Sequence, residues 1–210
     1  MLFRFPSVYP LTDVALSGMS HVEQVSLLID GGAPIIQLRE KKLSTREFYE
    51  QAKLAVTLAR SRGARIIIND RVDLAMSVGA DGVHLGQDDL PPEMARMLLG
   101  PDALIGVSTH SVHQAEKAVK LSINYLAIGP VFSTNTKSDT APIVGLEGVR
   151  AVKRIAGELP VVAIGGISEE QLPDVLAAGA DSAAVISAVF CNPSPIDVAM
   201  RRLLTAAKQI

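Results

Sequence analysis

The sequence predicts an α/β fold, a single (β/α)8 barrel of the TIM-barrel type that extends over residues 1–210. Three observations support this prediction. Short runs rich in Val, Ile and Leu recur about eight times, amphipathic stretches separate them, and Gly-Ala pairs precede several of the runs. Strands that are buried on both faces of a parallel sheet have this continuous apolar character. An open doubly wound sheet is the structural alternative, although such sheets usually have fewer strands.

The expected strands are the apolar runs themselves. In chain order they cover residues 8–11, 35–38, 66–68, 83–85, 104–107, 125–128, 161–164 and 183–186. Aromatic residues make up only 4% of the chain and Trp is absent. The core must therefore be built from aliphatic side chains, as is usual for parallel strands under helices.

Helix starts and stops separate the expected strands. A Ser followed three residues later by Glu or Gln marks a helix start, and the pairs are Ser44 with Glu47, Ser111 with Gln114, and Ser168 with Gln171. Gly-Ala-Asp precedes two of the runs, at residues 79–81 and 179–181. Glycine can adopt the left-handed conformation that ends a helix before the next strand begins. The repeated order of strand, helix and glycine is typical of a chain of βα units.

Composition excludes several classes of function. The 20 basic and 22 acidic residues give a net charge of -2, so there is no electrostatic case for binding nucleic acid or an anionic membrane. Cys191 is the single cysteine, which excludes an intrachain disulfide and favours a reducing, cytoplasmic location. We expect neither a signal peptide nor a membrane span. The oligomeric state is open, and a homo-oligomer is compatible with the sequence.

Charged residues follow the expected strands at their carboxyl ends, where barrels of this kind carry their functional groups. The cations are Arg39, Lys41 and Lys137, and the acids are Asp70 and Asp89, with Asp88 as the alternative. Cations beside acids suggest a polyanionic substrate bridged by a metal. Magnesium takes a few carboxylate oxygens and leaves room for phosphate oxygens, and Lys and Arg bind the remaining phosphate charge. A diphosphate bound in this way becomes a good leaving group.

A second anion site is expected after the seventh and eighth strands. Gly165 and Gly166 allow backbone amides to approach a ligand closely, and Ser168 is expected to open a helix there. The loops after strands seven and eight of such barrels often hold a phosphate. Two anion sites, one with a metal and one without, predict two phosphorylated substrates.

Each of these motifs also has a purely structural interpretation. Residues 39–41 can be a solvated run of charges, Asn69-Asp70 and Asp88-Asp89 can cap helices, and Gly165-Gly166 can be a turn. His84 is interpreted as a packed core histidine. The functional interpretation is favoured because all the structural ones would have to hold together at one rim of the barrel.

Six motifs in order resemble the thiamine phosphate synthase family. They are Gln37-Leu38-Arg39-Glu40-Lys41, Asn69-Asp70, His84-Leu85-Gly86-Gln87-Asp88-Asp89, Gly106-Val107-Ser108-Thr109-His110, Gly129-Pro130-Val131-Phe132 with Thr134-Asn135-Thr136-Lys137, and Ile164-Gly165-Gly166-Ile167. Any one motif is weak evidence, but their order and spacing cover nearly the whole chain.

The resemblance implies a role for each matching residue. For the pyrimidine diphosphate it implies contacts from Gln37, Leu38, Arg39, Glu40, Lys41, Asn69, Ser108 and Lys137, of which Arg39, Lys41, Ser108 and Lys137 are expected to be catalytic. For the thiazole phosphate it implies Thr134, Asn135, Thr136, Gly166, Ile186 and Ser187, and for Mg²⁺ it implies Asp70 and Asp89. The implied reaction substitutes the diphosphate at the pyrimidine methylene carbon by the thiazole nitrogen, and the thiazole can also carry a carboxylate.

Three other functions remain as alternatives. A related thiazole tautomerase shares the barrel and several motifs but needs no metal site. An aldolase-type lyase would need Lys41 or Lys137 to form a Schiff base. A binding protein for a thiamine precursor would bind its ligand without turnover. The charged constellation at the rim favours the synthase over all three.

Overall fold

The computed structural model describes residues 5–134 and 141–208, in which strands alternate with helices. The strands are β1 (Val8–Pro10), β2 (Ile35–Leu38), β3 (Arg65–Asn69), β4 (Gly82–Leu85), β5 (Leu104–Thr109), β6 (Tyr125–Ile128), β7 (Val161–Ile164) and β8 (Ser182–Val185). The helices are α1 (Val14–Ser17), α2 (His21–Asp30), α3 (Thr45–Ser61), α4 (Val72–Val78), α5 (Pro92–Leu99), α6 (Val112–Ala118), α7 (Gly145–Ala156), α8 (Leu172–Ala177), α9 (Ser187–Phe190) and α10 (Ile196–Ala206). Every expected strand overlaps one of these strands.

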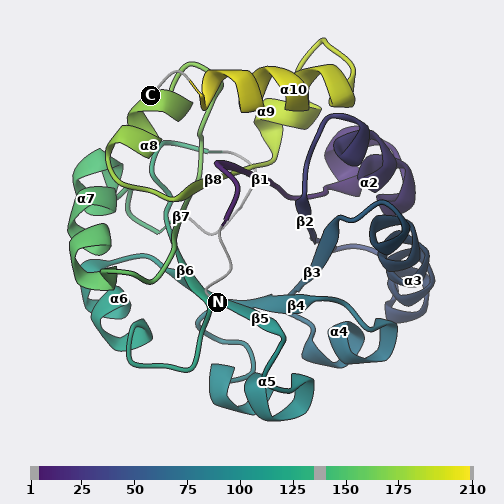
Figure 1. Cartoon of the computed structure of the whole chain (residues 1–210), viewed down its shortest axis with the longest axis horizontal. Coiled ribbons are helices and arrows are strands. Elements are labelled where there is room, and N and C mark those ends of the chain that lie inside the picture. Colours follow the sequence, from purple (N-terminus) through teal and green to yellow (C-terminus); the bar gives the residue numbers. More distant parts are fainter. Residues whose placement is uncertain (1–4, 135–140, 209–210) are drawn as a thin grey trace.

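The eight strands form one parallel sheet that curls into a ring, with the helices outside it (Figure 1). The strand order is β1-β8-β7-β6-β5-β4-β3-β2, so the first strand pairs with the last. Among the described residues, the Leu11↔Gln37 bridge and a 2.9 Å hydrogen bond from the Thr12 amide to the Gln37 carbonyl join β1 to β2. We call this joint, residues 11–12 with residue 37, the seam. The predicted (β/α)8 barrel is confirmed and the open doubly wound sheet is excluded.

The core has two layers, one on each side of the sheet. Ile66 and Ile68 of β3 belong to the layer between sheet and helices, whereas Ile67 belongs to the layer inside the barrel. This alternation follows from the two-residue period of a strand. The helices bury their apolar faces on the outer layer, and none in the described ranges is long and apolar enough to cross a membrane.

The repeated Gly-Ala-Asp stretches have the same structural role in both places. Oδ2 of Asp81 accepts the amide hydrogen of Ile66 at 2.8 Å, and Oδ2 of Asp181 accepts that of Val161 at 2.8 Å. Each aspartate therefore fixes the start of the strand that precedes it in the chain. The glycines of the two stretches have positive φ, +67° at Gly79 and +103° at Gly179, which confirms the expected helix stops.

Helices begin at two of the three expected capping residues, Ser44 and Ser111. The expectation that Ser168 opens a helix was wrong. Ser168 and Gln171 exchange hydrogen bonds as a capping pair does, but they enclose a turn, and α8 begins only at Leu172. Pro173 has no amide hydrogen to donate to the carbonyl four residues earlier, so regular helical bonding cannot be complete across this turn.

Candidate active site

Two cavities lie at the rim formed by the carboxyl ends of the strands. The inner cavity, about 20 Å³, is lined by inward-facing strand residues that include Tyr9, Gln37, Asn69, His84 and Tyr125. The rim cavity, about 300 Å³, is lined largely by apolar residues at the ends of β5 to β8 and in the loop after β6. Both are lined by Ser108, Ala127, Ile164 and Ala184. A polar and an apolar compartment therefore adjoin each other.

Arg39 and Lys41 both lie in the loop after β2. Arg39 lines the inner cavity, and its Nη1 lies 2.8 Å from Oδ2 of Asp13, with both side chains largely buried. Its Nε is buried and has no hydrogen-bond partner among the residues that the structure describes, so a donor is left for a bound oxygen. Lys41 is half exposed, and its Nζ lies 2.6 Å from Oδ2 of Asp70.

Asp70 and Asp89 face each other at the ends of β3 and β4. Burial raises the pKa of Asp89, and the charge and hydrogen bond of Asp70 raise it further, although the Gly86 amide and Lys41 oppose the shift. Asp70 has φ +65°, a conformation uncommon outside glycine and often found at functional sites. Neither carboxylate caps the helix that follows it, because α4 and α5 have no side-chain cap. The helix-capping interpretation of both acids was therefore wrong.

A chain of hydrogen bonds crosses the inner cavity. It runs from Gln37 Nε2 to the Tyr9 hydroxyl (3.2 Å), to the Tyr125 hydroxyl (3.3 Å), to His84 Nδ1 (3.0 Å), and from His84 Nε2 to the Ser108 hydroxyl (2.9 Å). Burial raises the pKa of both tyrosines, so both phenols stay neutral. Gln37 Oε1 is buried and has no partner in the described part of the chain.

Gly165 and Gly166 bring the end of β7 against the loop after β6. Their φ angles are +104° and +66°. A Cβ on Gly165 would lie 2.6 Å from Cα of Pro130, and one on Gly166 would lie 2.3 Å from the carbonyl oxygen of Ser133. Glycine is therefore required at both positions for this wall of the rim cavity to close.

Sequence comparison identifies the family to which this site belongs. Residues 8–189 match the family model described as thiamine monophosphate synthase. The chain belongs to the thiamine monophosphate synthase family. Membership makes it an enzyme, a transferase of thiamine biosynthesis.

Individual members of this family are similar in sequence to this chain over most of its length. A thiamine-phosphate synthase of Chloroflexus aurantiacus is 48% identical over 183 residues, which are 87% of this chain and 84% of that protein. One of Syntrophomonas wolfei is 45% identical over 198 residues, 94% of each chain. A solved structure, a thiamine phosphate pyrophosphorylase from Pyrococcus furiosus, superposes with a TM-score of 0.87 at 39% identity and covers 97% of this chain and 96% of its own.

Eight of the thirteen described residues that were predicted as site residues of this thiamine monophosphate synthase family member line one of the cavities. Those at the inner cavity are Gln37, Arg39, Asn69 and Ser108, and those at the rim cavity are Ser108, Thr134, Gly166, Ile186 and Ser187. Lys41, Asp70 and Asp89 form a charged group at the same rim. Asn135, Thr136 and Lys137 lie outside the described residues.

Leu38 and Glu40 are placed differently from the other predicted residues. The Leu38 side chain is fully buried between sheet and helices, so only its backbone can face a ligand. The Glu40 carboxylate points back to His21, at 3.0 Å, and not toward the cavities.

Sequence reasoning missed Tyr9 and Tyr125, and it treated His84 only as a core residue. All three are polar-tipped residues within buried strands, and all three line the inner cavity. The sequence signal was their polarity, since a hydroxyl or imidazole buried in a strand needs a hydrogen-bond partner.

Proposed function

We propose that this transferase joins 4-amino-2-methyl-5-hydroxymethylpyrimidine diphosphate to 4-methyl-5-(2-hydroxyethyl)thiazole phosphate, or to its carboxylate form. The products are thiamine phosphate and diphosphate, together with carbon dioxide when the thiazole carries the carboxylate. The C–O bond between the pyrimidine methylene carbon and the diphosphate breaks, and the diphosphate leaves with the electron pair. The lone pair of the thiazole nitrogen then forms the new C–N bond.

The observation that carries this proposal is the charged group of Arg39, Lys41, Asp70 and Asp89 beside two adjoining cavities. Arg39 has an unused buried donor, and the amine of Lys41 is half exposed. Both cations can bind phosphate oxygens and stabilise the charge that grows on the departing diphosphate. A tautomerase or a simple binding protein would not need this group.

The two carboxylates fit a magnesium ion. Asp70 and Asp89 lie within hydrogen-bonding reach of each other and repel when both are charged, so a divalent cation between them is favourable. No group of three or more His, Cys, Asp or Glu residues suited to a metal occurs in the described ranges. Two protein ligands leave the other positions to phosphate oxygens and water, as is usual for magnesium. When bound, the ion supplies positive charge to the leaving group.

We place the pyrimidine at the rim end of the inner cavity, which at about 20 Å³ is too small to enclose the ring, and the thiazole phosphate in the rim cavity. Gln37 Oε1, a buried acceptor without a partner among the described residues, can accept a hydrogen bond from the pyrimidine amino group, and Asn69 and Ser108 line the same space. In the rim cavity the apolar Ile186 can contact the thiazole ring. We assign the phosphate to Gly166, Ser187 and Thr134, with Asn135 and Thr136 as further proposed contacts, and Lys137 stays a proposed contact of the pyrimidine diphosphate.

Catalysis in this scheme needs no protein nucleophile. Arg39 and Lys41 hold the diphosphate, and Ser108 lies where the two cavities adjoin. The chain's contribution is to fix two substrates in contact and to stabilise the leaving group.

The test is to mix the purified protein with both substrates and to follow thiamine phosphate after oxidation to its fluorescent product. We expect turnover with Mg²⁺ and none with excess chelator. A folded protein that binds thiazole phosphate tightly but forms no product would overturn the synthase and favour the tautomerase or the binding protein.

A further inference from the structure

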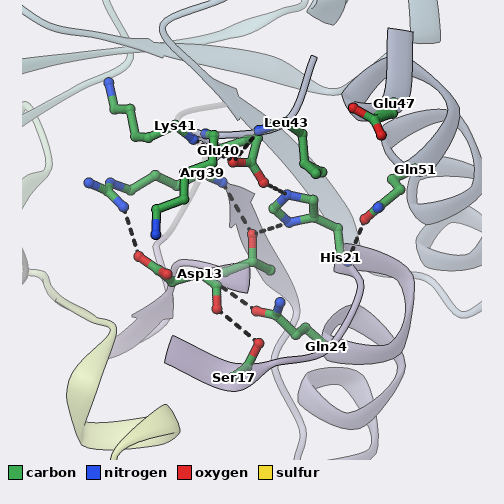
Figure 2. A network of polar contacts seen from close by, with 12 residues as sticks. Asp13, Ser17, His21, Gln24, Arg39, Glu40, Lys41, Leu43, Glu47 and Gln51 are labelled. Carbon is green, nitrogen blue, oxygen red and sulfur yellow. Dashed lines mark hydrogen bonds and ion pairs between the residues drawn. The ribbon is translucent and has the colours of Figure 1, made fainter. Parts of the chain in front are cut away.

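His21 is the first residue of α2, and its imidazole lies next to Glu40 of the loop that follows β2 (Figure 2). The side chain is 0% exposed, and it lines neither the inner cavity nor the rim cavity. It therefore cannot touch a substrate bound in either cavity. Its contacts lead toward Arg39 and Lys41, the two cations proposed to bind the diphosphate.

Both nitrogens of the His21 ring are held by hydrogen bonds. Nδ1 lies 2.8 Å from the hydroxyl oxygen of Thr12, and Nε2 lies 3.0 Å from Oε2 of Glu40. An ionised carboxylate can only accept, so Nε2 carries the hydrogen and Nδ1 accepts from Thr12. Burial lowers the pKa of His21 even though Glu40 and Asp13 raise it. The neutral ring, with one donor and one acceptor, matches both contacts.

The Glu40 carboxylate links the His21 ring to the backbone of the loop after β2. While Oε2 is held by His21, Oε1 accepts the backbone amides of three successive residues, Lys41 at 2.7 Å, Lys42 at 2.5 Å and Leu43 at 3.1 Å. The loop thus turns around one carboxylate oxygen. Burial alone would raise the pKa of Glu40, but the amides of Lys42, Leu43 and Lys41 and the ring of His21 together lower it. The carboxylate stays charged and keeps its acceptors.

The Thr12 hydroxyl links the His21 ring to the backbone of Arg39. The Thr12 hydroxyl, which donates to His21, accepts the backbone amide of Arg39 at 3.2 Å. The next residue, Asp13, holds the Arg39 guanidinium at 2.8 Å and is itself anchored by Gln24, which accepts its amide at 2.9 Å. Both the backbone and the head group of Arg39 are therefore fixed from the segment that follows β1.

α3 holds His21 from the other side. Gln51 accepts the backbone amide of His21 at 2.8 Å, and the Phe48 ring packs against the imidazole with centroids 5.2 Å apart. The imidazole is thus a rigid spacer between two helices and the loop, which is how a residue without substrate contact can set substrate geometry.

We propose that His21 is a positioning residue: by holding Glu40 and Thr12, it fixes the loop of residues 39–43 so that Arg39 and Lys41 meet the diphosphate. This inference deepens the proposed function and rests on it. It predicts an effect on one substrate only, because neither His21 nor Thr12 lines the rim cavity.

The test compares His21→Phe, which keeps a ring but removes both hydrogen bonds, with His113→Phe on the exposed surface of α6. We expect His21→Phe to raise the KM for the pyrimidine diphosphate by about tenfold or more, the loss typical of removing hydrogen bonds to charged groups. The KM for thiazole phosphate should stay within about twofold. His113→Phe should change neither. Equal changes in both KM values for His21→Phe, or none, would overturn the positioning role.

If His21→Phe does not fold, a second pair of variants, at Thr12, tests the same inference. Thr12→Val removes the hydroxyl that links His21 to Arg39, whereas Thr12→Ser keeps it. Only the valine variant should weaken binding of the pyrimidine diphosphate. Thr12→Val with unchanged binding contradicts the inference.

The activity of the wild-type protein tests the proposed function separately from the role of His21. If it forms no thiamine phosphate, the synthase proposal fails, but calorimetric titration with inorganic diphosphate and MgCl2 still compares wild type with His21→Phe. Weaker binding in the variant alone then supports positioning at an anion site, and equal binding rejects it.

Discussion

Nζ of Lys41 lies 2.6 Å from Oδ2 of Asp70, so a cation proposed to bind the diphosphate is paired with an acid proposed to bind magnesium. Each neutralises the other before a ligand arrives. With a diphosphate bound, Lys41 would exchange the carboxylate for phosphate oxygens, and Asp70 would be free to hold a magnesium ion. Without a ligand, the ion pair compensates the charges of Lys41 and Asp70.

Removing the charge of Asp70 tests this exchange. We expect Asp70→Asn to lower kcat/KM by about 100-fold or more, because an amide holds a divalent cation poorly and the leaving group loses its stabilisation. The measurement is turnover across a magnesium titration. Asp73→Asn, in the exposed first turn of α4, is the matched control and should behave like wild type. Near wild-type activity of Asp70→Asn at low magnesium would refute the metal assignment.

The hydroxyl of Tyr125 links Tyr9 to His84 inside the barrel. We expect Tyr125→Phe to lower the free energy of unfolding by about 1–2 kcal/mol, since buried polar groups lose a partner, and to raise the KM for the pyrimidine diphosphate because Gln37 and Ser108 stand at the ends of the chain. Urea unfolding and steady-state kinetics measure the two effects. Tyr49→Phe, a partly exposed tyrosine of α3, should leave both unchanged.

Gly166 offers a test of the rim cavity with a closely matched control. Gly166 has φ +66° and Gly18, at the exposed end of α1, has φ +68°, so alanine would need a positive φ at both. Only at Gly166 would the new Cβ collide, 2.3 Å from the Ser133 carbonyl oxygen, whereas nothing lies within 4 Å at Gly18. We expect Gly166→Ala to raise the KM for thiazole phosphate about tenfold, beyond the roughly 1 kcal/mol destabilisation shared by both variants. Similar kinetics for the two variants would count against this wall of the site.

Stability should depend on pH through His21. Burial lowers its pKa below the ordinary 6.5, although Glu40 and Asp13 act against the shift. Below pH about 6.5 the unfolded chain therefore binds a proton that the folded chain does not, and the free energy of unfolding falls as pH drops, by at most about 1.4 kcal/mol per pH unit for one proton. Urea unfolding at several pH values between about 7.5 and 5.5 should show this slope in wild type and in His113→Phe. It should be smaller in His21→Phe, and an unchanged slope there would contradict the assignment.

The strands were predictable because each apolar run is buried on both faces. β2, β6 and β7 have the expected bounds, and the others differ by one or two residues at their ends. The inner cavity was less predictable. Tyr9 and Tyr125 lie within apolar runs, and the sequence alone does not say whether a strand residue faces the barrel axis or the helices until register is known.

Contacts between distant residues account for what sequence reasoning missed. The start of α8 depended on Pro173, not only on the capping pair at Ser168. The Glu40 carboxylate meets His21, 19 residues away in the chain, and no local pattern marks that pairing. The charged residues Arg39, Lys41, Asp70 and Asp89 were easier to find, because parallel strands bring their carboxyl ends to one rim whatever the details of packing.

The pairing of β1 with β8 has a consequence during synthesis of the chain. Tyr9 and Ala184 both line the inner cavity, and they are register partners in that pairing. A ribosome makes Tyr9 well before Ala184, so a nascent chain holds every residue of the seam before the inner cavity can be completed. The inner cavity therefore cannot be complete in the growing polypeptide until β8 has been synthesised.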